Sequence, residues 1–178
     1  AVPALGLWLL LRRIAVPRSW RFWAGCRGMG ALNNALPFSL LFWGQSQMES
    51  GLAAILNATT AVFGAFVAAA LLPDEPLTRG KVMGAVLGLV GVLVILGPGL
   101  LQGLDPTDLA QLAILGAAVS YAFASVWGRV GMVSAQVEAN AFGMLSCSAV
   151  LALPMMLAER APALPSGVSA WAALVWPM

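Results

Sequence analysis

Long apolar runs that are almost free of charged side chains constrain this sequence more than any other feature. Five of them meet or approach the length of about 20 residues that a helix needs to cross a hydrocarbon core of about 30 Å, and they cover residues 22–43, 51–72, 80–98, 109–128 and 137–157. The end of another apolar helix is expected at 1–11, and the start of one more at 168–178. Backbone groups in hydrocarbon must be paired internally, and runs of this length without two-residue alternation predict helices.

The composition indicates that lipid surrounds these helices. Of the 178 residues, 61% are hydrophobic and 9% are charged, whereas a soluble domain carries about 25% charged residues. The mean hydropathy is +0.90. The net charge of +2 comes from basic residues scattered between apolar runs, so no nucleic-acid partner is expected. We therefore predict an all-α polytopic membrane protein whose partner is the lipid bilayer. Because the chain begins and ends inside apolar runs, we expect both ends to be truncations.

The basic residues predict the orientation of the helices. Cytoplasmic loops carry an excess of Lys and Arg, and alternate connectors of this chain hold seven basic residues against one. The first, third and fifth connectors are therefore predicted to be cytoplasmic. The seven residues are Arg12, Arg13, Arg18, Arg21, Arg79, Lys81 and Arg129, and the single one is Arg160.

A short internal sequence similarity, called the internal echo below, favours an architecture of inverted repeats. Residues 9–13 resemble residues 155–160, and a proline and a tryptophan follow each segment. Five helices lie within one such period, and an odd number of spans places successive repeats in opposite orientations. Secondary transporters are often built in this way, with the substrate site near the midplane of the membrane.

A recognisable order of motifs runs from Asn33 to Pro98. It comprises a helix middle, Ala31-Leu32-Asn33-Asn34, a helix end at 38–44, a helix start at 50–60, the acidic turn Asp74-Glu75-Pro76-Leu77-Thr78, and a Gly-rich helix at 81–97. In order and spacing this stretch resembles the EamA-type family of the drug/metabolite transporter superfamily. Asp74 and Pro76 depart from the family's acidic turn. Ala61 stands where many relatives have proline, which argues against a helix break there.

The resemblance implies a ten-helix fold of two inverted five-helix repeats, of which this chain would be a fragment. Residues 1–98 would be the end of the first repeat (helices 2–5), and residues 99–178 the truncated start of the second (helices 6–8). Family members carry amino acids, other metabolites or drugs across membranes, typically outward. The resemblance therefore implies a secondary carrier, and more specifically an exporter, that works by alternating access in the bacterial inner membrane.

Polar side chains at bilayer depth are unfavourable, which makes them candidates for binding a small-molecule substrate. A cavity of amides and hydroxyls would hydrogen-bond a polar solute, and the ring of the single tyrosine could stack on it. The alternative is helix packing, because such groups also bond across helices, at about 0.6–2 kcal/mol, and hydroxyls bond their own backbone. Pro37 predicts a kink beside the first two candidates. The candidates are Asn33, Asn34, Asn57, Thr59, Thr60, Ser120 and Tyr121, with Ser125 nearby.

Four glycines lie three or four residues apart and therefore share one face of a predicted helix. Small residues allow two helix backbones to approach closely, so we assign this stripe to helix packing, within the chain or between subunits of a homo-oligomer. The stripe consists of Gly80, Gly84, Gly88 and Gly91.

The charged residues inside or beside the runs have local interpretations. Arg27 lies about a turn inside its run and is expected to snorkel to the surface, with a gate or an anion site as the alternative. Thr78 is predicted to cap the helix that follows, with acidic residues near its positive end. Glu49 and Glu138 lie near helix ends, so no carboxylate is predicted at mid-bilayer for proton coupling.

Three classes of function compete. A membrane-embedded enzyme needs a convergent acid, base, nucleophile or metal, but the chain has no histidine and its spans hold no Asp pair. We therefore predict no catalytic residues, no metal and no cofactor, and Cys26 and Cys147 are expected to be packing residues. A structural or assembly subunit would need only the glycine stripe. A carrier accounts for the polar residues as well and is the preferred prediction.

Overall fold

Helices and their connecting turns make up residues 2–132 and 135–158, the part of the chain that the computed structural model describes, and no strand occurs in it. The predicted helix at 168–178 and the second half of the internal echo lie mostly or wholly outside these residues. The elements are α1 (Val2–Leu11), α2 (Trp20–Gly30), the π-helical η1 (Ala31–Ala35), α3 (Leu36–Gln45), α4 (Ser50–Ala58), α5 (Thr60–Leu71), α6 (Arg79–Leu96), the 3₁₀-helical η2 (Pro98–Gly103), α7 (Leu109–Val130) and α8 (Val137–Ala158).

Four helical stretches in the described part are long and apolar enough to cross a membrane: Ser50–Leu71, Arg79–Leu96, Leu109–Val130 and Val137–Pro154. They correspond to four of the five predicted runs. The remaining run, 22–43, forms α2, η1 and α3 as one continuous helical stretch whose middle is π-helical. The predicted all-helical, multi-pass membrane architecture is confirmed.

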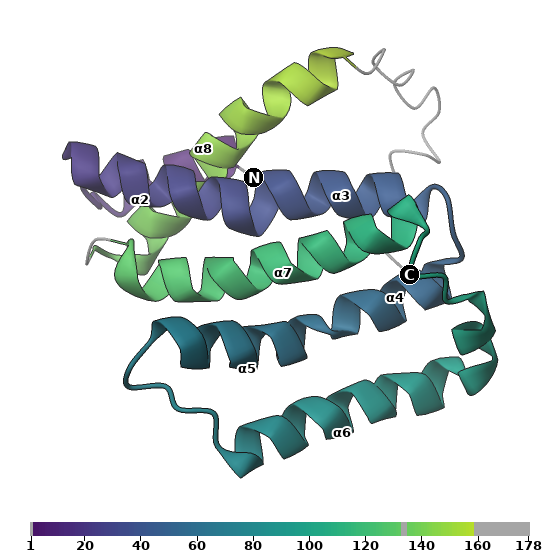
Figure 1. Ribbon diagram of the computed structural model, residues 1–178. Coiled ribbons are helices and arrows are strands. Elements are labelled where there is room, and N and C mark those ends of the chain that lie inside the picture. The colour runs from purple at the N-terminus through teal and green to yellow at the C-terminus, as the bar shows by residue number, and fades with distance from the viewer. Residues whose placement is uncertain (1, 133–134, 159–178) are drawn as a thin grey trace.

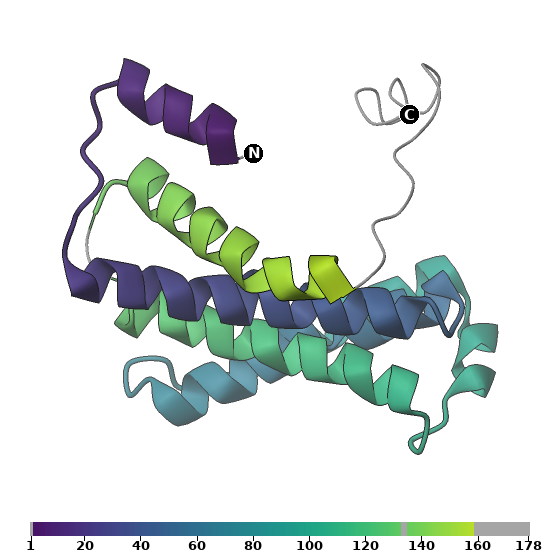
Figure 2. The same cartoon turned by 90° about the horizontal axis from the view of Figure 1, so that it is seen from above.

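Helix α7 lies at the centre of the arrangement. It contacts the α2–η1–α3 stretch on one side and α4 and α5 on the other, and Figure 1 shows α6 beyond them at the edge. Helix α8 packs against α2, as the view in Figure 2 makes clear. Helix α7 has ten buried residues whereas α6 has none. Long apolar helices of similar composition therefore occupy very different places in the fold.

The connectors alternate between two ends of the bundle, as the charge pattern predicted. Arg129, at the end of α7, donates to Asp74 in the α5–α6 connector at 2.7 Å. A Cβ on Gly25, near the start of α2, would lie 2.5 Å from the carbonyl oxygen of Gly131. The first, third and fifth connectors therefore share one end, and the second and fourth lie at the other (Figure 1).

The closest helix contacts are made by glycines outside the predicted stripe. A Cβ on Gly44 of α3 would lie 2.9 Å from the carbonyl oxygen of Ala110 in α7. In contrast, a Cβ on three of the stripe glycines would meet nothing within 4 Å in the described part, and one on the fourth only its neighbour Thr78 at 4.0 Å. Contact between the stripe and another subunit remains a prediction.

An ion-pair network joins the α5–α6 connector to the ends of α6 and α7. Thr78 caps α6 as predicted, because its hydroxyl accepts from the Lys81 backbone N–H at 3.3 Å. The Glu75 carboxylate accepts from the side chains of Lys81 and Arg129. These hydrogen bonds, that from Lys81 foremost, lower the pKa of Glu75. The network therefore depends on an ionised Glu75.

We expect Arg129→Gln to lower the melting temperature of the purified protein by a small, pH-dependent amount. Because the pKa of Glu75 is lower in the folded state, its stabilising contribution is present above its ordinary value of 4.5 and is lost as the pH falls through the folded value. The difference in melting temperature between Arg129→Gln and the unmodified protein should therefore disappear at acidic pH. Arg79→Gln is the control, since Arg79 makes no ion pair within the described ranges. A difference that is the same at every pH would contradict the prediction.

Candidate functional site

The predicted irregularity beside Pro37 takes the form of the π-helical turn η1. The Leu36 N–H donates to the Ala31 carbonyl, five residues back. The Leu32 carbonyl therefore loses its usual donor, Leu36, and the next residue along is a proline, which has no N–H. One backbone carbonyl in the middle of the span is thereby released from the helix. Single π-turns of this kind often occur at functional sites.

Ser120 supplies the missing partner. Its hydroxyl, on the central helix α7, donates to the Leu32 carbonyl at 2.8 Å, and the residue is only 9% exposed. Serine side chains of neighbouring helices commonly satisfy backbone groups that a proline frees inside a membrane. The structure thus gives this candidate a defined hydrogen bond between α7 and η1.

The two asparagines of η1 differ in their surroundings. The side-chain amide of Asn34 donates to the Ser148 hydroxyl of α8 at 2.9 Å, and this hydroxyl in turn lies 2.8 Å from the Met144 carbonyl. Asn33 is half-buried, and its side chain makes no hydrogen bond with the described residues. Asn34 therefore joins η1 to α8, whereas the side-chain amide of Asn33 is available to hydrogen-bond a ligand.

The span Ser50–Leu71 is broken at Thr59, between α4 and α5, although Ala61 had argued against a break nearby. Ala61 itself lies inside α5, so no break occurs there, and the interruption at Thr59 does not depend on a proline. The Thr59 hydroxyl donates to the Leu56 carbonyl at 2.5 Å and the Thr60 hydroxyl to the Asn57 carbonyl at 2.6 Å. Hydroxyls that bond back to the preceding turn compete with the backbone ladder and bend helices.

Asn57 lies two residues before this break. Its side-chain oxygen Oδ1 is buried and has no hydrogen-bond partner in the described part of the chain. Tyr121, on α7, is half-buried, and its hydroxyl likewise makes no hydrogen bond with a described residue. An unpaired buried acceptor is destabilising by about 1–3 kcal/mol unless something else satisfies it, so Asn57 is the candidate most in need of a ligand.

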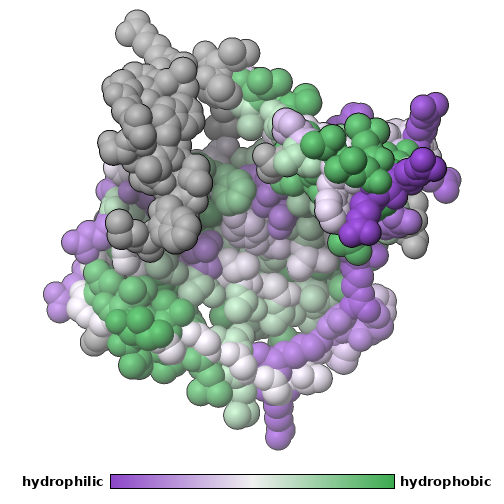
Figure 3. Space-filling model, turned by 180° about the vertical axis from the view of Figure 1, so that it is seen from behind, coloured by the Kyte–Doolittle hydropathy of each residue, from purple (hydrophilic) through white to green (hydrophobic). Residues whose placement is uncertain are grey.

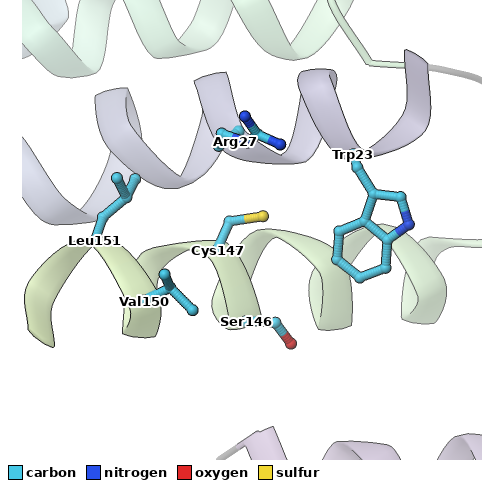
Figure 4. A pocket seen from close by; sticks show the side chains of 6 residues that line it. All are labelled: Trp23, Arg27, Ser146, Cys147, Val150 and Leu151. Carbon is cyan, nitrogen blue, oxygen red and sulfur yellow. The ribbon is translucent and has the colours of Figure 1, made fainter. Parts of the chain in front are cut away.

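A cavity that the sequence did not predict lies between α2 and α8. Its volume is about 430 Å³, and Figure 4 shows the six side chains that line it. A second cavity of about 500 Å³ lies where α1 and its connector approach α2 and α8. The first is lined by Trp23, Arg27, Ser146, Cys147, Val150 and Leu151. Arg27 inside an apolar run was the one sequence signal for it.

Much of the outer surface is apolar. Figure 3 shows hydrophobic patches at the lower left and upper right of one face, with side chains of intermediate hydropathy between them and hydrophilic ones mainly toward the rim. On α6, Val94 and Ile95 are 75% and 83% exposed. Such a surface, wrapped around helices of membrane length, contacts the acyl chains of lipids.

The fold and surface together define a multi-pass integral membrane protein in contact with the lipid bilayer. A family model described as the EamA-like transporter family matches residues 1–97. The chain belongs to this family of membrane transporters, within the drug/metabolite transporter superfamily, as the resemblance implied. No curated protein and no solved structure matches it.

Proposed function

We propose that this chain is part of a secondary carrier that moves small polar metabolites by alternating access. The observation that carries the proposal is the buried, unpaired Oδ1 of Asn57 beside a break in a membrane span. A polar solute could satisfy this oxygen during transport. Discontinuous helices near the midplane are where secondary transporters bind their substrates.

Two interrupted spans flank the same helix, which supports this reading. The π-turn η1 and the break at Thr59 lie in stretches that both contact α7. The groups still available there are the amides of Asn33 and Asn57 and the Tyr121 hydroxyl, whereas the other predicted candidates bond to protein groups. In this proposal Asn34, Thr59, Thr60 and Ser120 hold the two interrupted stretches in place on the two sides of α7. Asn57 contacts the solute, and Asn33 and Tyr121 are further candidates for solute contact.

The finer details of the proposal come from the family resemblance. They are outward transport, a location in the bacterial inner membrane, and two inverted repeats meeting near residue 98. We also propose that the glycine stripe on α6 packs against another copy of the chain in a homo-oligomer.

We expect Asn57→Ala to lower the initial rate of solute flux in proteoliposomes by about tenfold, the effect of losing one hydrogen bond worth about 1.4 kcal/mol. The melting temperature should stay nearly unchanged, because Oδ1 bonds to no described protein group. Asn34→Ala is the matched control and should lower stability, since it removes the bond to Ser148. Unchanged flux in Asn57→Ala would assign this side chain to packing.

A structural or assembly subunit is the second candidate. The open glycine face of α6 favours it, because three of its glycines have nothing within 4 Å in the described part. Transport distinguishes the two: a carrier gives saturable solute flux after reconstitution, and an assembly subunit gives none.

A further inference from the structure

The cavity between α2 and α8 lies deep in the membrane span. Trp23 and Arg27 line it from α2, and the other four side chains come from α8 (Figure 4). Ser146 and Cys147 are in the middle of α8, whose 22 residues begin at Val137. At 1.5 Å per residue, Ser146 lies about 13 Å from the start of a helix about 33 Å long. Ser146 therefore lies near mid-bilayer, whereas Arg27 lies nearer the end of its span, about 10 Å from the start of α2 at Trp20.

Both kinds of polar group that line the cavity are unpaired. Arg27 makes no ion pair and no side-chain hydrogen bond with a described residue. The Oγ atom of Ser146 is buried and has no partner among those residues. No carboxylate is among the lining side chains that the structure describes. The Arg27 side chain is exposed, and a guanidinium within the span is stabilised by an anionic partner.

The remaining lining side chains are apolar or weakly polar. Trp23, Val150 and Leu151 offer an indole ring and aliphatic groups. The guanidinium of Arg27 suits a carboxylate, because guanidinium forms paired hydrogen bonds with planar anions. Among the described lining residues no acidic side chain could hold an ammonium group. The cavity therefore suits an organic monoanion with an apolar body better than a zwitterion or a cation.

We propose that this cavity binds the carboxylate of a small organic anion, with Arg27 as its counter-charge. Trp23, Val150 and Leu151 pack against the apolar body of the anion. The proposal rests on the proposed transport function and specifies its substrate class.

The native Cys147 allows a test that does not depend on transport. Cys147 lines the cavity, whereas Cys26 is fully buried. The full chain in liposomes is treated with two thiol reagents of similar size, sulfonatoethyl and trimethylammonioethyl methanethiosulfonate. We expect the anionic reagent to react faster, and Arg27→Gln to lower the ratio of anionic to cationic rates at least about tenfold, as loss of a nearby charge in a low dielectric predicts. A change in the fraction of Cys147 that is present as thiolate affects both reagents alike. The ratio of the two labelling rates therefore reports the charge of Arg27 alone.

Matched variants and ligands complete the experiment. Cys147→Ser should abolish labelling, Cys26→Ala should leave it unchanged, and Arg27→Lys should retain part of the charge preference. Phenylacetate should protect Cys147, whereas phenethylamine should not and phenylalanine should protect less. Equal rates for the two reagents, a ratio unaffected by Arg27→Gln, or no labelling at all would overturn the proposal. Absence of flux combined with an intact charge preference would instead reject the carrier function and leave the anion site standing.

Discussion

The substitution Gly44→Val is expected to lower the free energy of unfolding by about 1–3 kcal/mol, the usual effect of overpacking a close contact. A Cβ at this position would lie 2.9 Å from the Ala110 carbonyl oxygen and 2.8 Å from the Ile114 side chain. The carbonyl belongs to the backbone of α7 and cannot rotate away, so α3 and α7 must separate. Equilibrium unfolding in mixed micelles, followed by circular dichroism, measures the loss.

The control for this prediction is Gly88→Val, on α6. A Cβ there meets nothing within 4 Å in the described part, and valine has a somewhat higher helix propensity than glycine. Its free energy of unfolding should therefore stay the same or rise slightly. Comparable losses of unfolding free energy in Gly44→Val and Gly88→Val would contradict this prediction. They would mean that something outside the described residues covers α6, and that the loss at Gly44 does not come from its close approach to α7.

The substitution Ser120→Ala is expected to lower the free energy of unfolding by about 1–3 kcal/mol, because it leaves a buried carbonyl unpaired. The carbonyl is that of Leu32, which the π-turn and Pro37 leave without a backbone donor. No water in the hydrocarbon region can replace the hydroxyl. The same unfolding assay measures the effect.

Two further variants make this second prediction specific. Ser125 lies on the same helix, is exposed, and donates only to the Ala122 carbonyl of its own turn at 2.7 Å. Ser125→Ala should change stability by less than about 0.5 kcal/mol. In a Pro37→Ala background a backbone N–H is restored near the Leu32 carbonyl, so the effect of Ser120→Ala should shrink. An undiminished effect would show that the hydroxyl does not act through this carbonyl.

The helices and their alternation could be predicted because they depend on properties local to the sequence. Apolar length predicted the spans, and the positions of arginines such as Arg129 predicted which connectors share an end. Thr78 was predicted as a helix cap from its position alone, and the structure confirms it. Each of these inferences needs only neighbouring residues and the thickness of a bilayer.

The contacts between helices could not be predicted in the same way. Hydropathy does not distinguish the central α7 from the peripheral α6, since both runs are apolar. The glycine stripe has the spacing of a packing motif, yet Gly44, which lies outside it, makes the close approach. The partner of Ser120 is a carbonyl 88 residues away in sequence, and Arg27 and Ser146 line one cavity only because α2 packs on α8. Such pairs follow from tertiary geometry.

The π-turn η1 also has a geometric consequence for the span that contains it. One additional residue in a helical turn rotates every later side chain by about 100° around the axis. The stretch before η1 can therefore present its contact face to α8 while the stretch after it presents a face to α7. A rotation of this helical stretch about its own axis would therefore change its contacts with α7 and α8 together.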